Sequence, residues 1–147
     1  MSSVVDVLGE DHRRCDSEFA AAEAAAGAGD LQRCAALFRT FRGSLLRHFR
    51  LEEEILFPGF EAAIGDAAGP TQMMRQEHDM MRELIDAMQN ALDARSCEDY
   101  LGAADTLMVL MQQHNMKEEG ILYPMCDGVL SGRWDAMHLQ MQDMPLE

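Results

Sequence analysis

A histidine followed four residues later by a glutamate occurs twice in this chain. The two pairs are His48 with Glu52 and His114 with Glu118, separated by 66 residues (114 − 48 = 66). Side chains four residues apart lie on the same face of a helix, so each pair can present an imidazole and a carboxylate together. The same interval relates His12 to His78. Four of the five histidines therefore belong to one duplicated pattern, and imidazole and carboxylate groups are typical metal ligands.

The segments that carry these residues have apolar side chains at intervals of three and four, which predicts amphipathic helices. The first helix is expected over residues 4–26. The second follows Asp30, a good N-cap, and its buried face is expected to continue through the first histidine–glutamate pair to Ile55. Pro58 is expected to kink or end this helix, and a loop is expected over residues 65–70.

The buried positions of these two helices recur 66 residues later and predict two more. The third should begin at Pro70 or Thr71, and the fourth should follow Ser96, with a buried face that continues to Ile121. Two helical hairpins with short loops predict an all-α, up-down-up-down four-helix bundle with an internal two-fold duplication. We expect this bundle over residues 1–126, and residues 127–147 as a C-terminal extension that can form a short capping helix.

Composition agrees with this fold and excludes several functions. The apolar residues are mostly Ala, Leu and Met, which favour helices over strands. A net charge of −14 over 147 residues argues against binding to nucleic acid or to anionic membranes. The chain has no apolar run of about 20 residues and no signal-peptide pattern, so a cytoplasmic location is expected. Its four cysteines form no C-x-x-C pair and are expected to be reduced thiols.

The buried glutamates favour metal binding over simple packing. A lone histidine on an apolar helix face is more often a hydrogen-bonded core residue than a ligand, but four in register with two glutamates favour ligation. No Lys or Arg lies on the same buried faces, and an unpaired buried carboxylate is costly. Mixed imidazole and carboxylate ligation suits iron or manganese better than structural zinc. Two six-coordinate ions bridged by two glutamates and a shared oxide or hydroxide would keep about two open positions.

This constellation resembles the hemerythrin-like family, the HHE cation-binding domains, over roughly residues 4–126. The resemblance depends on the duplicated pattern and on the Ile-Leu-Phe/Tyr-Pro segment after each carboxylate. It implies two iron ions in a non-haem di-iron centre with an oxo or hydroxo bridge. It also implies terminal ligands and bridging carboxylates at the following residues: His12, His48, His78 and His114 as terminal ligands, and Glu52 and Glu118 as bridges.

Two departures from the oxygen carriers of this family bear on function. The carriers have a fifth histidine one helical turn before the third-helix ligand, where this chain has Met74. The missing histidine would leave a coordination site open on one iron. An open site favours oxidation to a stable diferric state over reversible binding of O2. The carriers also place their last carboxylate five residues after its histidine, which would select Glu119. The internal symmetry with Glu52 favours Glu118 instead.

Other residues near the pattern have two interpretations each. Glu53 and Glu119 are most simply solvated, and the alternative is that they orient a ligand histidine. Asp11 and Glu77, each just before a histidine of the pattern, have the same two interpretations. The aromatic residues Phe57 and Tyr123 are expected to plug the core under the site, and the methionines of the buried faces to fill it.

Three functions remain open at this point. The first is a binding protein that takes up O2, NO or peroxide at an open iron position, for sensing, storage or detoxification. The second is a di-iron enzyme that turns over peroxide or NO, or that donates iron for iron–sulfur cluster repair. The third is a regulatory bundle whose metal controls folding and the docking of a protein partner. The pattern favours a binding or sensing protein over an enzyme.

Overall fold

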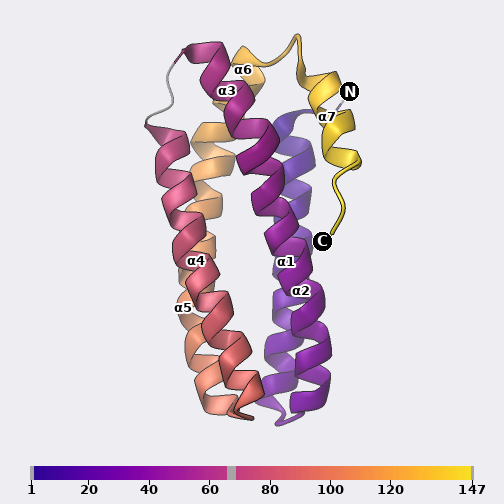
Figure 1. The fold of residues 1–147 in the computed structure, drawn as a ribbon, viewed down its shortest axis with the longest axis vertical. Coiled ribbons are helices and arrows are strands. Elements are labelled where there is room, and N and C mark those ends of the chain that lie inside the picture. Colours follow the sequence, from indigo (N-terminus) through magenta and orange to yellow (C-terminus); the bar gives the residue numbers. More distant parts are fainter. Residues whose placement is uncertain (1, 66–68, 147) are drawn as a thin grey trace.

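The structure of the protein, a computed structural model, describes residues 2–65 and 69–146, and all regular elements in these ranges are helical. The bundle is built from four long helices, which are α1 (Val4–Gly27), α2 (Leu31–Leu51), α4 (Pro70–Asp93) and α5 (Cys97–Lys117). They run alternately up and down, with α1 beside α2 and α4 beside α5 (Figure 1). The predicted all-α bundle of two helical hairpins is confirmed.

Helix ends fall where local chemistry favours them. The side chains of Ser3, Asp30 and Ser96 each accept a hydrogen bond from the backbone N–H three residues later, which caps α1, α2 and α5. Helix α4 begins at Pro70, whose fixed φ suits a first helical turn. The loop predicted over residues 65–70 includes residues 66–68, which lie outside the described residues.

Helix α2 does not end at Pro58. A five-residue π-helical turn, η1 (Glu52–Leu56), joins α2 directly to α3 (Phe57–Ile64). The second hairpin repeats this arrangement, because η2 (Glu118–Leu122) joins α5 to α6 (Tyr123–Val129). In each π turn the N–H of the residue before the proline donates to the C=O of the glutamate five residues back. The interruption expected at Pro58 therefore lies one turn earlier, at the glutamate itself.

The π turns change which residues are buried after each glutamate. Each turn contains one residue more than an α-helical turn, so later side chains are rotated by about 100°. Ile121 is 59% exposed and Ile55 is only partly buried, whereas Leu122 and Tyr123 are buried. The expectation that the buried faces continue through these two residues is therefore wrong for Ile121, whereas Ile55 is partly buried and packs against buried apolar residues. The residues after the isoleucines face the core instead.

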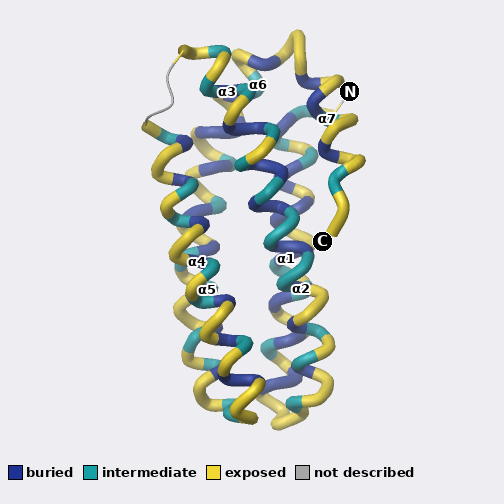
Figure 2. Tube along the Cα trace, viewed as in Figure 1, coloured by how far each residue is buried: buried dark blue, intermediate teal, exposed yellow. Residues whose placement is uncertain are grey.

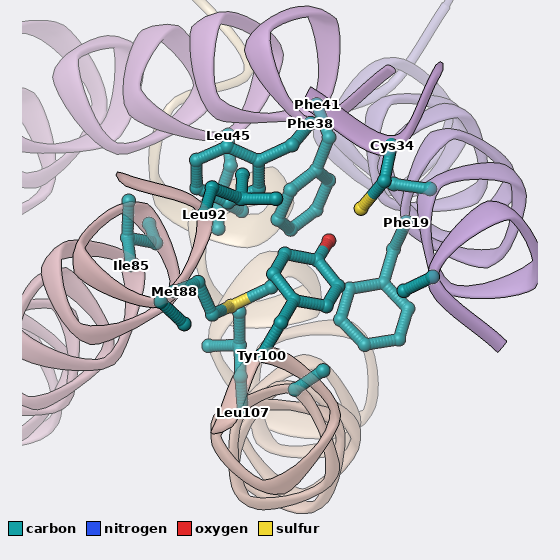
Figure 3. Packing of buried hydrophobic residues seen from close by; sticks show 14 of the residues in the cluster. Phe19, Cys34, Phe38, Phe41, Leu45, Ile85, Met88, Leu92, Tyr100 and Leu107 are labelled. Carbon is teal, nitrogen blue, oxygen red and sulfur yellow. The ribbon is translucent and has the colours of Figure 1, made fainter. Parts of the chain in front are cut away.

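Buried residues lie along the inner faces of the helices (Figure 2) and form two separate apolar clusters. The turn-end cluster lies toward the α1–α2 and α4–α5 turns, and all four helices contribute to it (Figure 3). It includes Phe19, Cys34, Phe38, Phe41, Leu45, Ile85, Met88, Leu92, Tyr100 and Leu107. The α7-end cluster lies toward α3 and α6 and includes Leu8, Leu56, Phe57, Phe60, Met74, Leu122, Tyr123, Leu130, Trp134 and Met137.

A last helix, α7 (Trp134–Gln142), lies against the outside of the bundle beside α1 and α2 (Figure 1). The Trp134 indole N–H donates to the Ser2 carbonyl over 2.7 Å. The Arg47 guanidinium donates to the carbonyls of Met141 and Met144, which anchors the end of α7 and the segment after it to α2. The division of the chain at residue 126 stays a prediction. Among the described residues, none of the helices is both long enough and apolar enough to span a bilayer.

Candidate metal centre

The structure brings all six predicted ligands into one layer of the bundle interior. All six are buried: His12 from α1, His48 from α2, Glu52 from η1, His78 from α4, His114 from α5 and Glu118 from η2. They form two groups in which the potential ligand atoms lie within 4.8 Å of one another. One group contains Glu52, His78, His114 and Glu118, and the other contains His12, His48 and Glu118. This cluster of histidines and glutamates fits a metal site.

Glu118 belongs to both groups, and its two oxygens face opposite halves of the layer. Oε1 lies 3.0 Å from His12 Nε2, and Oε2 lies 3.2 Å from His114 Nε2. Glu52 also faces two histidines, because its Oε1 lies 3.0 Å from His78 Nε2 and 3.4 Å from His48 Nε2. Both carboxylates are therefore placed between imidazoles of different helices.

A carboxylate contacts the other ring nitrogen, Nδ1, of every histidine in the layer. Each Nδ1 lies 2.7 Å from a carboxylate oxygen, and the four pairs are His12 with Glu119, His48 with Asp11, His78 with Glu53 and His114 with Glu77. The simpler expectation, that these carboxylates are solvated, is wrong, and the alternative that they orient histidines fits the geometry. The sequence did contain a signal, because Asp11 and Glu77 are 66 residues apart (77 − 11 = 66), as are Glu53 and Glu119 (119 − 53 = 66).

These contacts also settle the position of Glu119. Its Oε2 accepts a hydrogen bond from His12 Nδ1 on the outer side of the ring, and its side chain is partly exposed. Glu118, in contrast, is fully buried among the Nε2 atoms. The structure therefore places Glu118 in the layer and Glu119 behind a histidine, as the internal symmetry suggested.

We call the four carboxylates that contact Nδ1 atoms the outer carboxylates; they are Asp11, Glu53, Glu77 and Glu119. Basic side chains neutralise the charge of three of them. Arg82 donates to Glu53 over 2.7 and 2.9 Å, Lys117 pairs with Glu77, and Arg14 pairs with Asp11. Burial alone would raise the pKa of Glu53, but hydrogen bonds from His78 and Arg82 hold it at about 2. Glu53 is therefore a carboxylate near neutral pH, and it can only accept the hydrogen bond from the imidazole.

The hydrogen-bond pattern leaves an electron-rich centre. Because each Nδ1 donates its proton to a carboxylate, a neutral imidazole must direct the lone pair of its Nε2 inward. The Nε2 atoms of His12 and His48 lie only 3.1 Å apart. Four further buried atoms in the layer have no hydrogen-bond partner among the described residues, and they are Glu52 Oε1, His78 Nε2, His114 Nε2 and Glu118 Oε2. Unpartnered lone pairs in a dry core are costly unless a cation binds them, so the donor set fits metal ions.

The electrostatics of the layer also favour positive charge. Burial alone would lower the pKa of His114, but the charge of Glu118 and the hydrogen bond to Glu77 raise it to about 9. The pKa of His78 is likewise raised against its burial, by the close carboxylate of Glu52 and the hydrogen bond to Glu53. Burial and the charge of Glu118 raise the pKa of Glu52, because two neighbouring carboxylates resist joint ionisation. Cations between these groups would relieve that conflict.

Sequence reasoning missed one group in the layer, the hydroxyl of Tyr123. This residue was expected to be an apolar plug, and its ring does pack against His12 with centroids 5.5 Å apart. Its hydroxyl, however, lies 2.6 Å from Glu52 Oε2 and 3.0 Å from Glu118 Oε1. The residue at the corresponding position of the first hairpin is Phe57, so the two halves differ here by one oxygen atom.

Comparison with known proteins agrees with this geometry. A family model described as the hemerythrin HHE cation-binding domain matches residues 3–126. The chain is also 32% identical over 90 residues to the iron-sulfur cluster repair protein YtfE of Musicola paradisiaca (strain Ech703). That alignment covers 54% of this chain and 40% of the relative, so the chain spans less than half of that protein. No solved structure matches the chain.

Proposed function

Because the chain belongs to the family of hemerythrin HHE cation-binding domains, we propose that its buried layer holds two iron ions and binds a small redox-active ligand such as O2 or NO. The resulting role is sensing, storage or detoxification of that ligand. The observation that carries the proposal is the set of four buried, unpartnered ligand atoms facing one another from two helical hairpins. Iron suits this set better than manganese or zinc do in the proposed role, because it combines affinity for imidazole and carboxylate with redox chemistry.

The residues divide between the two ions according to their distances. His12 and His48 would hold one ion and His78 and His114 the other, and Glu52 and Glu118, which each face histidines of both pairs, would be shared between the two ions. The outer carboxylates fix the orientation of each ring and hold its Nδ1 proton on the outer side, so that Nε2 faces the ions. The apolar clusters on both sides of the layer exclude water, which strengthens each of these interactions. When bound, the iron pair supplies the electrons for reversible reaction with a diatomic ligand.

A cytoplasmic location is part of the proposal. All four cysteines are free thiols, which suits a reducing compartment. Iron in such a compartment is kept largely reduced, and reduced iron is the form that reacts with O2 or NO.

The test combines metal analysis with rapid mixing. Protein purified without added iron should contain close to two irons per chain, and its anaerobic, reduced form should change its visible absorption within seconds of mixing with O2 or NO. Glu118→Ala should lose iron and the optical change, whereas Glu54→Ala should keep its iron because the Glu54 side chain is exposed. Wild-type protein with two irons and no spectral response to either gas would rule out the ligand-binding role.

Iron–sulfur cluster repair is a second candidate, favoured by the similarity to the repair protein over 54% of this chain. In this role the iron pair is delivered to a damaged cluster in another protein. The iron-loaded protein should then restore the activity of an oxidised [4Fe–4S] hydratase faster than an equal amount of free ferrous iron. Equal rates of recovery would exclude the repair role and leave the ligand-binding role untouched.

A further inference from the structure

We infer that the hydroxyl oxygen of Tyr123 is a seventh protein ligand at this centre, bound to the ion that His12 and His48 hold. It follows that the exchangeable ligand binds at the other ion, between His78 and His114. The inference rests on the proposed function because it requires two bound ions. It makes the centre asymmetric, although the chain is built from two similar hairpins.

The distances around the Tyr123 hydroxyl match the spacing of ligand atoms around one metal ion. Tyr123 Oη lies 3.1 Å from His12 Nε2, 3.4 Å from His48 Nε2 and 3.0 Å from Glu118 Oε1. His12 Nε2 is itself 3.1 Å from His48 Nε2 and 3.0 Å from Glu118 Oε1. Ligand atoms bound at about 2.1 Å and at right angles around one ion lie roughly 3.0 Å apart. These four atoms therefore have the spacing of ligands that share an ion, and only the 3.9 Å between His48 Nε2 and Glu118 Oε1 requires a wider angle.

Hydrogen bonding alone accounts poorly for the same contacts. The phenol has one proton, which it can donate to Glu52 Oε2 over 2.6 Å. In the neutral rings that bind metal, the Nδ1 protons go to outer carboxylates, so the remaining neighbours are all acceptors: Glu118 Oε1 and the Nε2 atoms of His12 and His48. Several lone pairs would then face one another in a buried space. A cation among them binds all of these lone pairs at once.

The first hairpin provides an internal comparison. The Phe57 ring stacks on His78 at 5.8 Å and 22°, and the Tyr123 ring stacks on His12 at 5.5 Å and 25°. The paired imidazoles are also alike, at 4.6 Å and 57° for His12 with His48 and 4.9 Å and 53° for His78 with His114. In these ring contacts the two halves are alike, and Tyr123 adds a hydroxyl that Phe57 lacks. Phe57 offers no oxygen to the second ion, so the exchangeable position remains there.

Coordination replaces the O–H bond of the phenol with an O–metal bond. The proton leaves to solvent as the metal loads, as it does when other protonated ligands bind a metal. No oxidant or reductant is needed for this step. A phenolate bound to ferric iron has a ligand-to-metal charge-transfer band in the visible range, and excitation in that band enhances the ring vibrations of the bound tyrosine.

The chain offers a matched control, because it contains two tyrosines and Tyr100 lies in the turn-end cluster. Resonance Raman spectra of the ferric, iron-loaded protein should show phenolate ring modes in the wild type and in Tyr100→Phe, and none in Tyr123→Phe. Iron content should stay at two per chain in all three. Phenolate modes that are absent from the wild type, or unchanged in Tyr123→Phe, would overturn the inference. Failure of every variant to bind two irons would instead refute the proposed function.

A second variant tests the position of the exchangeable ligand without removing a group. Phe57→Tyr adds the missing hydroxyl to the half that contains His78 and His114. We expect a second set of phenolate modes and at least a tenfold loss of affinity for azide, a small anion that binds open ferric positions. Tyr123→Phe should bind azide at least as tightly as the wild type. Unchanged azide affinity in Phe57→Tyr would show that the open position lies elsewhere.

Discussion

Among the single residues, the outer carboxylates matter as much for the geometry of the site as the predicted ligands do. Glu53 contacts no ligand atom of the layer, yet it joins His78 to Arg82 through short hydrogen bonds. The charge of Arg82 keeps Glu53 ionised, and Glu53 in turn holds the Nδ1 proton of His78. The orientation and basicity of the His78 ring thus depend on a residue outside the proposed ligand set.

We therefore predict that Glu53→Gln weakens metal binding by about 10- to 100-fold, because the neutral amide holds the Nδ1 proton less strongly. The adjacent, exposed Glu54 provides the control, and Glu54→Gln should bind as the wild type does. Competition with a chromophoric chelator measures both affinities. Equal affinities for the two variants would show that Glu53 does not orient His78.

Among the helical elements, the π turns decide which side chain returns to the layer after Glu52 and after Glu118. In an α-helix, Tyr123 would be rotated away from Glu118, because five residues exceed one turn by more than a third of a rotation. In the wider π turn the residue five positions on lies nearly above the glutamate. The N–H of Tyr123 donates to the Glu118 carbonyl, and its hydroxyl reaches Glu118 Oε1. The backbone irregularity therefore places a polar group in the layer.

This role of the π turn predicts that a one-residue deletion within it is tolerated. Deletion of Gly120 should convert the turn to α-helical spacing while Glu118 and Tyr123 keep facing the layer, because Gly120 has open space around it. Gly102 also has open space around it but lies within the regular helix α5. Its deletion should rotate His114 by about 100° relative to the start of the helix.

Circular dichroism and iron content compare the two deletions. We expect the Gly120 deletion to keep its helicity and most of its iron, and the Gly102 deletion to lose its iron. Equal loss in both would mean that the π turn is itself needed to hold the metal.

In the molecule as a whole, the polar layer divides the core. It lies between the turn-end and α7-end clusters, and its ligands come from both hairpins. The four long helices therefore meet at this polar layer as well as at apolar contacts. Without cations, the buried carboxylates and lone pairs of the layer oppose this close approach.

Removal of metal should consequently lower the stability of the whole bundle. At free metal one hundred times above its Kd, binding adds about 2.7 kcal/mol to the free energy of unfolding. For a chain of this size that corresponds to a rise in Tm of roughly 5–10 °C, measured by calorimetry before and after treatment with a chelator. Glu118→Ala should show a much smaller difference between its treated and untreated forms. A wild-type Tm that is indifferent to chelation would contradict a metal-coupled fold.

The bundle and its ligand layer could be predicted from the order of the residues alone. Helical periodicity assigns His12, His48, Glu52 and their counterparts 66 residues later to buried faces, and hairpins with short loops can bring four such faces together in only a few ways. These features depend on interactions within one turn or between neighbouring helices, which the spacing of residue types records. Asp30 as a helix cap is equally local and was predicted correctly.

The remaining features required the packed bundle. The π turns, which moved burial from Ile121 to Leu122 and Tyr123, involve hydrogen bonds to a carbonyl five residues back that periodicity does not reveal. The partner of each outer carboxylate lies on another helix, so its assignment needs the positions of both helices. The hydroxyl of Tyr123 likewise acquires its neighbours from four different elements. Contacts between distant segments depend on the rotation of each helix about its axis, and that rotation is fixed only when the helices pack.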